Sequence, residues 1–407
     1  MKGLCCPRFL NGDRTMNTFY ETVVIGGGII GLSCGYYLSK SGRNVLVLDR
    51  AEFGAGSSGA CDDMILLQSK KAGVTLELAM ESLEMYRGLH EELGCDLGFK
   101  QLGGMILIEN DRDLSIMEDF VSGQRSCGLD VDIVDRTVVK HRQPHVNEKF
   151  FASTYSADDS QVDPLHVMKG FTAAGRKLGM EVLYREGVIG ADQSGSGSWK
   201  LTTDSGRCVE SESVVIAAGA WSGRVGDLFD ISIPVSPKRG QLLITEKIPP
   251  IGETNLWTAS YMVTKLRPDL VDKIDTSALG LGFSFTRTVD GNYLIGSTRE
   301  QAGFDKRVSY EALRALSRQV LDIIPLMRHV HIIRHIAGFR PAVADGRMIL
   351  GAWPGREGLF VATGHEGDGI AMAPVTGRLL SAMVGGLSPD RKVRELGPER
   401  VAVGGAL

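Results

Sequence analysis

The chain has 407 residues, of which 43% are hydrophobic and 23% are charged, a balance typical of globular proteins with a substantial core. Its net charge of −4 gives no reason to expect a nucleic-acid partner. No apolar run reaches the roughly 18 residues of a membrane-spanning helix, so no transmembrane segment is expected.

Residues 1–15 are expected to form an N-terminal tail, with Met16 as an alternative start. The opening stretch lacks the apolar core of a secretory signal peptide. Seven cysteines are scattered along the chain without a CxxC pair: Cys5, Cys6, Cys34, Cys61, Cys95, Cys127 and Cys208. Their odd number and their spacing indicate a reducing, cytoplasmic compartment. They argue against a disulfide framework and against an iron–sulfur site within this chain.

The stretch YETVVIGGGIIGLSCGYYLSKSGRNVLVLDR predicts a strand, a tight turn, a helix and a second strand. The turn fits the pattern G-x-G-x-x-G at Gly26, Gly28 and Gly31. These glycines would allow, in that order, the tight turn itself, the close approach of the backbone to a pyrophosphate, and the close packing of the helix on the strand. Asp49 ends the second strand, where an acidic side chain can accept hydrogen bonds from ribose hydroxyls. The pattern predicts a dinucleotide site and leaves FAD and NAD open.

Two helices and a sheet are predicted next along the chain. Val74–Leu93 carries an apolar stripe at helical spacing. A second helix is predicted to start with Asp163 as N-cap and Pro164 at the first helical position. Apolar runs in GGMILIEN, RGQLLITEK and GLGFSFTRTVDGNYLIGST predict a mixed sheet, with a hairpin turn at Asp290-Gly291. The stretch SYEALRALSRQVLDIIPLM predicts another helix.

Two later stretches each contain a buried strand that ends in a turn of small residues. SVVIAAGAWSG is the first of them. In the second, LFVATGHEGDGIAMAPVTGRLLSAMVGG, a glycine loop leads into a helix over about 370–383. Free N–H groups at the N-terminus of such a helix favour negative charge.

Taken together in this order, the motifs resemble the D-amino-acid oxidase and glycine oxidase family of FAD oxidoreductases, over about residues 20–386. GAGSSGACDDMILLQSKKAG is similar to the family's Ser-rich loop around the flavin, and AGFRPAVADGRMILG is similar to its G-x-R-P signature. PVSPKRGQLL and GNYLIGSTRE resemble its substrate-domain strands. Within the family, ACDDMILLQSK and GHEGDG look like the flavin β subunits of hetero-oligomeric D-hydroxyproline, proline and opine dehydrogenases and of hydrogen cyanide synthase.

The resemblance implies an α/β fold in which a Rossmann-like FAD-binding domain interleaves with a smaller α+β substrate domain built on a mixed sheet. The FAD-binding domain is expected to comprise residues 16–98, 150–226 and 332–407. The substrate or partner domain is expected to comprise residues 99–149 and 227–331.

FAD is the cofactor that the resemblance implies, and FMN shared at a subunit interface is a further option. The residues expected to bind FAD are Gly26, Gly28, Ile30, Gly31, Asp49, Arg50, Ser57, Ser58, Gly59, Ala218, Gly219, Trp221, Gly338, Gly364, His365, Glu366, Gly367, Asp368, Gly369 and Ile370. In GHEGDG the glycines would let backbone pass against the flavin, with Asp368 as N-cap of the next helix. The alternatives are an acid–base role for His365 and a metal site, for which His365 lacks a histidine at i+3 or i+4. No metal is expected.

An amino-acid substrate is implied, and its carboxylate needs an anchor. Arg340 in GFRP matches the family position for this anchor, and a guanidinium can bind a carboxylate through two hydrogen bonds. The alternative for Arg340 is an ordinary ion pair. Tyr293 and Phe285 are further candidates, on the sheet expected to face the flavin. Cys61 lies near the flavin loop, but a covalent thioether from it is not favoured.

The chain is therefore expected to be an FAD-dependent amino-acid dehydrogenase subunit that oxidises a C–N bond to an imine by hydride transfer to flavin N5. D-hydroxyproline, proline or an opine is the expected substrate. Electrons would pass to partner subunits with further redox centres, through which the protein could also lie at the periphery of a membrane. The alternatives are a stand-alone amino-acid oxidase that uses O₂, as in glycine oxidase, and a non-catalytic flavin subunit.

Overall fold

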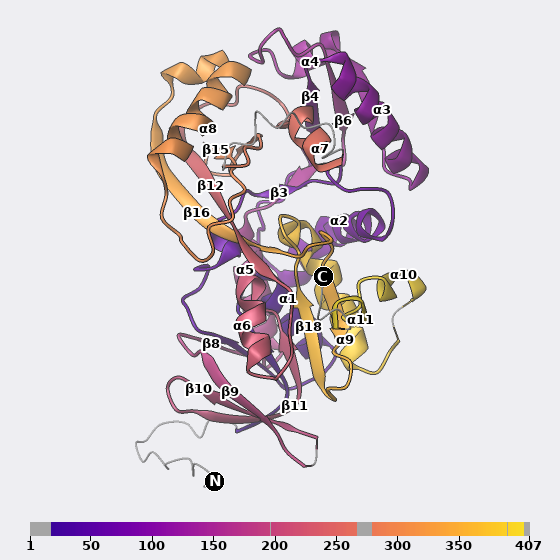
Figure 1. Cartoon of the computed structure of the whole chain (residues 1–407), viewed down its shortest axis with the longest axis vertical. Coiled ribbons are helices and arrows are strands. Elements are labelled where there is room, and N and C mark those ends of the chain that lie inside the picture. Colours follow the sequence, from indigo (N-terminus) through magenta and orange to yellow (C-terminus); the bar gives the residue numbers. More distant parts are fainter. Residues whose placement is uncertain (1–17, 196, 267–278, 389, 403–407) are drawn as a thin grey trace.

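The structure is a computed structural model that describes residues 18–195, 197–266, 279–388 and 390–402. The predicted tail, with Cys5 and Cys6, lies outside these ranges. The described chain forms two parts, each built on a large sheet, that are stacked along the long axis of the molecule (Figure 1).

The first sheet has a parallel core with the strand order β18-β11-β1-β2-β8. Its strands are β1 (Phe19–Ile25), β2 (Val45–Asp49), β8 (Glu181–Tyr184), β9 (Val188–Gln193), β10 (Trp199–Thr203), β11 (Cys208–Ile216), β17 (Ile349–Ala352) and β18 (Leu359–Thr363). β17 is antiparallel to β18, and the β9–β10 hairpin pairs antiparallel with β11. Because β1 lies between β2 and β11, the strand order reverses at β1. The carboxyl end of β1 is therefore where a sheet of this kind binds ligands.

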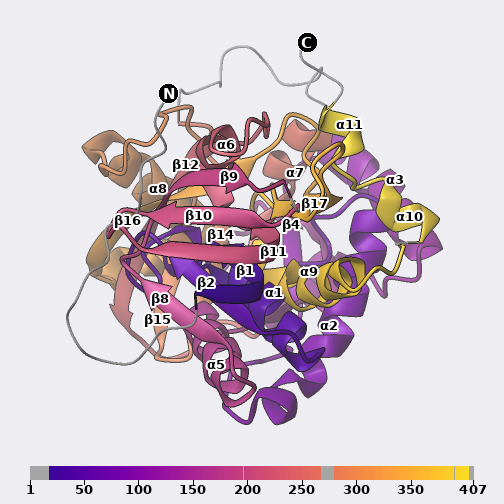
Figure 2. The same cartoon turned by 90° about the horizontal axis from the view of Figure 1, so that it is seen from below.

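Helices cover one face of this sheet (Figure 2): α1 (Ile29–Lys40), α2 (Val74–Leu93), α5 (Pro164–Lys177) and α9 (Gly369–Val384). Their apolar side chains, such as Leu32 and Phe171, share one core with the sheet residue Val47. The opposite face packs against β10 and the chain after α6 (Ser222–Asp227), with Trp199 and Phe229 in that second core.

Local signals in the sequence set the ends of several helices. The Asp163 carboxylate accepts hydrogen bonds from the N–H groups of Leu165 (2.8 Å) and His166 (3.0 Å), and Pro164 is the first residue of α5, as predicted. α2 has the predicted bounds and ends at Gly94, whose φ of 67° is left-handed and suits glycine.

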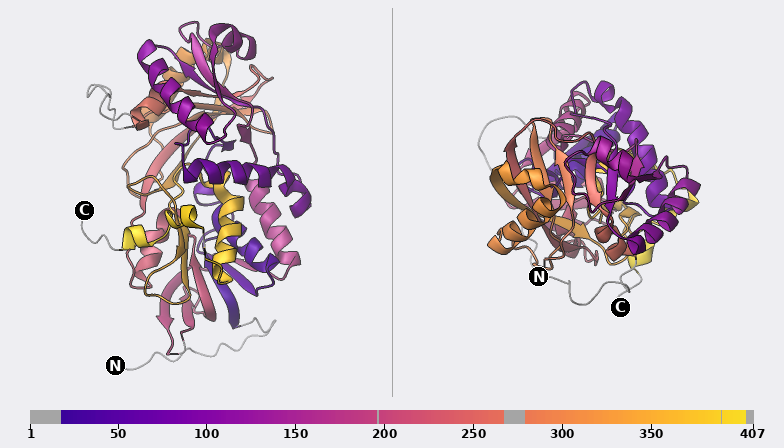
Figure 3. Two further views of the ribbon diagram at one scale, coloured as in Figure 1. Left: turned by 90° about the vertical axis from the view of Figure 1, so that its right-hand side faces the viewer. Right: turned by 90° about the horizontal axis from the view of Figure 1, so that it is seen from above.

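The second sheet is mixed and has the strand order β16-β12-β15-β14-β13-β4-β6-β5. Its strands are β4 (Gly104–Ile108), β5 (Asp132–Asp135), β6 (Ala152–Ser156), β12 (Ser236–Lys247), β13 (Asn255–Thr258), β14 (Ser284–Arg287), β15 (Asn292–Gly296) and β16 (Ile332–Ala342). Around it lie α3 (Asp111–Ser126), α4 (Arg136–Arg142), α7 (Ala259–Leu266) and α8 (Tyr310–Ile323), in the upper part of Figure 3, left. β14 and β15 form the predicted hairpin around Asp290-Gly291.

Shorter elements complete the described chain. They are β3 (Met64–Ile65), which pairs with β7 (Ser160–Gln161), the 3₁₀ turns η1 (Ser57–Gly59), η2 (Gly219–Trp221) and η4 (Pro325–His329), and the helices α10 (Arg391–Arg394) and α11 (Glu399–Ala402). No described helix combines the length and the apolar character needed to cross a membrane.

The predicted α/β fold with a mixed second sheet is confirmed, but two strands differ from the predicted division of the chain. β6 and β16 fall in the segments 150–226 and 332–407, which were assigned to the FAD-binding domain, and both pair in the second sheet. β16 is antiparallel to β12 from Ala342 opposite Ser236 to Ile332 opposite Thr245. This long-range pairing brings the end of β16 toward the first part of the molecule (Figure 1), and Arg340 lies near that end, opposite Lys238 of β12.

Candidate active site

A first cavity, of about 1420 Å³, opens at the carboxyl ends of the parallel strands. Its walls include the turn after β1, the loop after β2, the turn after β11 and the loop between β18 and α9. All four segments leave the same edge of the sheet, because parallel strands end on one side. This is the position predicted for the dinucleotide.

The three glycines of the G-x-G-x-x-G turn have different roles. A Cβ at Gly26, where φ is 119°, would lie 2.4 Å from the Ala217 carbonyl oxygen, and a Cβ at Gly31 would lie 1.8 Å from the Gly26 oxygen. Those two glycines therefore allow β1, β11 and α1 to pack. A Cβ at Gly28 would meet only Ser58 Oγ, at 3.3 Å, and Gly28 lines the cavity. Its small size leaves room for a ligand.

The N-terminus of α1 opens into this cavity. Gly28 is its N-cap residue and has no side chain to cap it, and its first turn contains no acidic residue. The Ile29 N–H donates to Ser58 Oγ at 3.1 Å. Such a helix end offers free N–H groups and a partial positive charge, which suit a phosphate. The geometry fits the predicted pyrophosphate.

Asp49 lines the cavity and organises the adjoining backbone. Its Oδ2 accepts from the Gly27 N–H at 2.7 Å, and its Oδ1 accepts from the Ala51 N–H at 2.8 Å. Burial raises the pKa of Asp49, and the two backbone N–H groups oppose that rise. A carboxylate oxygen has two lone pairs, so each oxygen of Asp49 can still accept from a ribose hydroxyl.

The GHEGDG loop brings a second helix N-terminus to the same cavity. Gly369 and Ile370, the first residues of α9, line the cavity wall. Asp368 occupies the predicted N-cap position, but its side chain does not cap the helix, and its carboxylate pairs with Lys70 Nζ at 2.9 Å. The Lys70 side chain is 1% exposed, so this buried cation draws the carboxylate away from the helix end.

His365 is buried in the same loop and faces the first cavity. Its Nε2 lies 3.1 Å from Thr376 Oγ1, and burial lowers the pKa of His365 to about 4. The ring is therefore neutral at neutral pH. Within the described part of the chain, no group of three or more His, Cys, Asp or Glu side chains could hold a metal ion.

Most of the residues predicted to bind FAD line this cavity: Gly26, Gly28, Ile30, Asp49, Arg50, Ser57, Ser58, Ala218, Gly219, Trp221, His365, Glu366, Gly367, Gly369 and Ile370. The others are Gly31, Gly59, Gly338, Gly364 and Asp368, which are not among the lining residues. A Cβ at Gly59 would lie 2.0 Å from the Gly54 oxygen, and a Cβ at Gly364 would lie 2.5 Å from Val343 Cγ2. These glycines let the walls of the cavity pack closely.

A second cavity, of about 1080 Å³, adjoins the first. The two share the lining residues Ser57, Cys61, Phe339, Glu366 and Gly367. The second cavity extends from this shared wall between the loop after β2 and strands of the second sheet. A small molecule in it would lie beside a ligand of the first cavity.

Arg340, the predicted substrate anchor, lines the second cavity. Its Nη1 donates to the Thr298 carbonyl oxygen at 2.9 Å, and its Nη2 donates to Ser297 Oγ at 2.8 Å. A Cβ at Gly240, on β12, would lie 2.3 Å from Nη1, so glycine there makes room for the guanidinium. Arg340 has no ion-pair partner among the described residues, which argues against the alternative of an ordinary ion pair.

Sequence reasoning missed three polar residues of the second cavity. Arg299 Nη1 pairs with Glu366 Oε1 at 2.9 Å, and its guanidinium lies 4.7 Å from the centre of the Tyr261 ring. The Tyr261 hydroxyl is buried and has no hydrogen-bond partner among the described residues. Burial raises the pKa of Asp62, which the neighbouring Arg340 opposes. Asp62 and Arg299 lie inside stretches that resemble the family's motifs, but the residue pattern alone does not show that the sheet register and the loop path bring them to one cavity with Tyr261.

Tyr293 and Phe285 are not at the cavity. Their rings stack on each other, with centroids 4.4 Å apart, inside the core of the second sheet. The Tyr293 hydroxyl accepts a hydrogen bond from the Ile251 N–H at 3.0 Å. Neither residue is among those that line either cavity, so their predicted placement beside the flavin is not observed.

The cysteines differ in their bonding. Cys34, Cys61, Cys95 and Cys127 are free, whereas Cys208 is disulfide-bonded, which its spacing did not predict. Cys61 lies in the wall shared by both cavities, and its Sγ donates to the Ser58 carbonyl oxygen at 3.4 Å. Burial raises the pKa of the Cys61 thiol, so the thiolate needed for a thioether is disfavoured.

Asp63, next to the second cavity, gives a testable dependence of stability on pH. It is 5% exposed, its Oδ1 has no hydrogen-bond partner among the described residues, and burial raises its pKa to about 7. In the unfolded chain the carboxyl ionises near pH 3.8. Between these values the folded protein binds more protons than the unfolded chain, so the stability falls as the pH rises.

Asp63→Asn is expected to remove this pH-dependent loss of stability, because an amide does not ionise. Between pH 5 and pH 8 the free energy of unfolding decreases in the wild type. We expect this decrease to be smaller in the variant by about 2–3 kcal/mol. Denaturant titrations at both pH values measure the difference. Asp227→Asn, at an exposed site, is the matched control. An equal pH dependence in all three proteins contradicts the assignment.

Comparison with known proteins places the chain among related sequences. A family model described as FAD dependent oxidoreductase (DAO) matches residues 21–383. The chain is 28% identical to the hydrogen cyanide synthase subunit HcnC of Pseudomonas protegens, over 90% of this chain and 92% of that protein. It is 26% identical to the glycine oxidase of Bacillus subtilis, over 91% of this chain and 94% of that protein. The structure is similar to the crystal structure of glycine oxidase from Geobacillus kaustophilus, with a TM-score of 0.83 and 25% sequence identity. The match covers 94% of this chain and 98% of the glycine oxidase chain.

Proposed function

This chain belongs to the DAO family of FAD-dependent oxidoreductases, and we propose that it is an amino-acid dehydrogenase subunit that oxidises a C–N bond to an imine. The observation that carries the proposal is the Arg340 guanidinium, which lies beside the FAD cavity and has no carboxylate partner among the described residues. Asp62 and Glu366 attract this cation from beyond ion-pair distance, and a desolvated cation without a directly bonded anion is costly. The site therefore favours a substrate that brings a carboxylate.

The first cavity has the features that FAD needs. The N-terminus of α1 would bind the pyrophosphate, and Asp49 would accept from the ribose. The N-terminus of α9 and the His365–Gly367 backbone would face the other end of the cofactor. FAD, when bound, supplies the acceptor for a hydride from the carbon next to the substrate nitrogen.

Three side chains of the second cavity would act on the substrate. Arg340 uses two of its five N–H groups on Thr298 and Ser297, which leaves donors for a carboxylate. The buried Tyr261 hydroxyl is a further donor. Asp62, in the same cavity, supplies a negative charge that attracts the amino group and can accept its proton, which leaves the amine in the neutral form that loses a hydride.

The proposed substrate is D-hydroxyproline, proline or an opine, with electrons passed to partner subunits. The name of the relative from Pseudomonas protegens, a hydrogen cyanide synthase subunit, supports a role within a larger assembly. The partners would carry further redox centres, share a second flavin (FMN) with this chain at their interface, and provide any contact with a membrane.

A stand-alone amino-acid oxidase is the second candidate. It is favoured by the likeness to glycine oxidases, which extends over 91% of this chain for the Bacillus subtilis protein. The two candidates share the FAD cavity and the Arg340 anchor, and they differ in the electron acceptor.

The electron acceptor separates the two candidates. We expect that flavin reduced anaerobically by an amino acid is reoxidised slowly by air and rapidly by a redox dye, because the proposed subunit delivers electrons to partners. Absorbance of the oxidised flavin and a peroxide assay measure both routes, with dithionite-reduced protein as the substrate-free control. One peroxide released per turnover, at the rate of turnover, would instead establish the oxidase.

A further inference from the structure

Residues 297–309, which connect β15 to α8, reach both cavities. At one end, Ser297 lines the second cavity, and the Ser297 hydroxyl and the Thr298 carbonyl hold Arg340. Further along, Lys306 lines the first cavity. We call residues 297–309 the bridging segment.

The middle of the bridging segment covers part of the FAD cavity wall. Phe304 stacks on Trp221, with ring centroids 5.3 Å apart, and meets Phe339 edge-on at 5.7 Å. Lys306 Nζ donates to the Ala55 carbonyl oxygen at 3.0 Å. Trp221, Phe339 and Ala55 all line the first cavity, so the segment closes over residues that would contact FAD.

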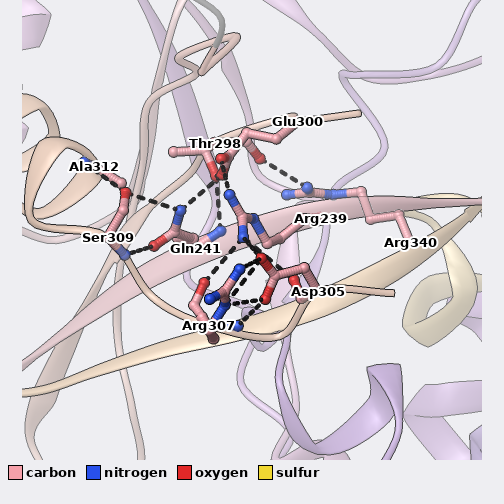
Figure 4. Close-up of polar contacts among 9 residues, drawn as sticks. All are labelled: Arg239, Gln241, Thr298, Glu300, Asp305, Arg307, Ser309, Ala312 and Arg340. Atoms are coloured by element: carbon pink, nitrogen blue, oxygen red, sulfur yellow. Dashed lines mark hydrogen bonds and ion pairs between the residues drawn. The ribbon is translucent and has the colours of Figure 1, made fainter. Parts of the chain in front are cut away.

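A buried ion pair holds this segment on β12 (Figure 4). Arg239 Nη2 donates to Glu300 Oε2, and the two side chains are 12% and 8% exposed. Their backbones also exchange hydrogen bonds, from the Arg239 N–H to the Glu300 oxygen at 3.0 Å and from the Glu300 N–H to the Arg239 oxygen at 2.9 Å. The pair therefore fixes both the side chains and the main chain at Glu300.

From this pair, hydrogen bonds lead to both ends of the segment. Glu300 Oε1 accepts from Thr298 Oγ1 at 2.6 Å, next to the carbonyl that holds Arg340. Arg239 Nη1 donates to the carbonyl oxygens of Asp305 (3.3 Å) and Arg307 (3.0 Å), on either side of Lys306. Gln241 completes the network by donating to Glu300 Oε1 at 2.8 Å.

We propose that the Arg239–Glu300 pair is a positioning unit that sets the Arg340 guanidinium for its substrate and, through the same segment, keeps the wall of the FAD cavity closed. Neither residue lines either cavity. The part of this proposal that concerns Arg340 and its substrate rests on the proposed function, and the part that concerns the wall of the FAD cavity rests only on FAD dependence. Loss of the Glu300 charge would leave Arg239 with only the half-exposed Asp305 carboxylate, 3.5 Å from its Nη1. A buried cation that loses its main partner is costly, so a change at Glu300 should affect both ends of the segment.

Glu300→Gln keeps the shape of the side chain and removes its charge. We expect FAD to dissociate about tenfold faster or more, and acetate, as a minimal carboxylate probe, to need an about tenfold higher concentration to perturb the flavin absorbance. Flavin fluorescence after dilution measures the first effect and an absorbance titration measures the second. Glu300→Asp, which keeps the charge, should recover part of both.

Glu186→Gln is a matched control. Glu186 is 9% exposed, and its side chain is bonded by Thr203, Ser205 and Arg207, none of which lines either cavity. The substitution leaves in place its backbone hydrogen bond to the Asp49 carbonyl oxygen. It should lower the melting temperature without changing FAD release or acetate binding. If Glu300→Gln behaves as this control does, the pair is only structural and the proposal is overturned.

Two milder variants test each end should Glu300→Gln fail to fold. Lys306→Met should speed FAD release alone, and Thr298→Val should weaken acetate binding alone, because each change touches one end of the segment. Unchanged values in both variants also overturn the proposal. A wild-type protein that releases FAD normally but never responds to acetate contradicts the carboxylate anchor, and FAD release from Glu300→Gln then still decides on the positioning unit.

Discussion

Arg340→Leu is expected to keep its full content of FAD and to lose reduction of that FAD by the amino-acid substrate. The guanidinium does not line the first cavity, so its removal should not weaken the binding of FAD. The substrate carboxylate would lose its charged partner in a largely desolvated site, at a cost of about 3–5 kcal/mol. At low substrate, flavin reduction should therefore slow by roughly two to four powers of ten, as stopped-flow absorbance would measure.

Controls for Arg340→Leu separate an anchor from a structural role. Arg340→Lys should recover only part of the rate, because a point charge cannot form the paired hydrogen bonds of a guanidinium. Arg136→Leu, on the outer helix α4, should change nothing in flavin reduction. An amine without a carboxylate should react poorly with the wild type and lose little more in Arg340→Leu. Near-normal reduction of Arg340→Leu by the substrate would mean that the anchor is elsewhere.

Gly28→Val is expected to yield a folded protein without FAD. A Cβ at Gly28 has only Ser58 Oγ within 4 Å, at 3.3 Å, so the fold can accommodate a side chain, but the side chain would extend into the cavity where the pyrophosphate is expected. The ratio of flavin absorbance to protein absorbance in the purified protein measures this, and circular dichroism checks the fold.

Gly88→Val, on α2, is the matched control, since nothing lies within 4 Å of a Cβ there. It should bind FAD like the wild type. A yellow Gly28→Val protein with one FAD per chain would show that the cofactor does not approach the turn after β1 in the predicted way.

Elements with strong local signals could be predicted from the sequence. α2 has the bounds that its apolar stripe indicated, and α5 starts at Pro164 with Asp163 as its cap. The turn at Gly26–Gly31 and the GHEGDG loop were predicted to lie at one site, and both line the first cavity, because their glycines and the helices after them have few alternative uses.

The features that could not be predicted depend on contacts between distant residues. Asp368 is the N-cap residue of α9 as predicted, but its side chain does not cap the helix, because the buried Lys70, from a loop far away in the sequence, pairs with its carboxylate. Tyr293 was placed at the flavin because the face of a strand cannot be known before its register is known. The Arg239–Glu300 pair joins β12 to the segment after β15, a pairing that no local pattern encodes.

The central claim is that Arg340 binds the carboxylate of a free amino acid and thereby places the C–N bond of that substrate next to FAD. Anaerobic titration of the holoprotein with D-hydroxyproline, D- and L-proline, glycine and an opine, followed by flavin absorbance, tests it most directly. At least one of these compounds is expected to bleach the flavin fully, while pyrrolidine, which lacks the carboxylate, does not. A flavin that dithionite bleaches and none of the amino acids reduces would contradict the claim and leave a non-catalytic flavin subunit.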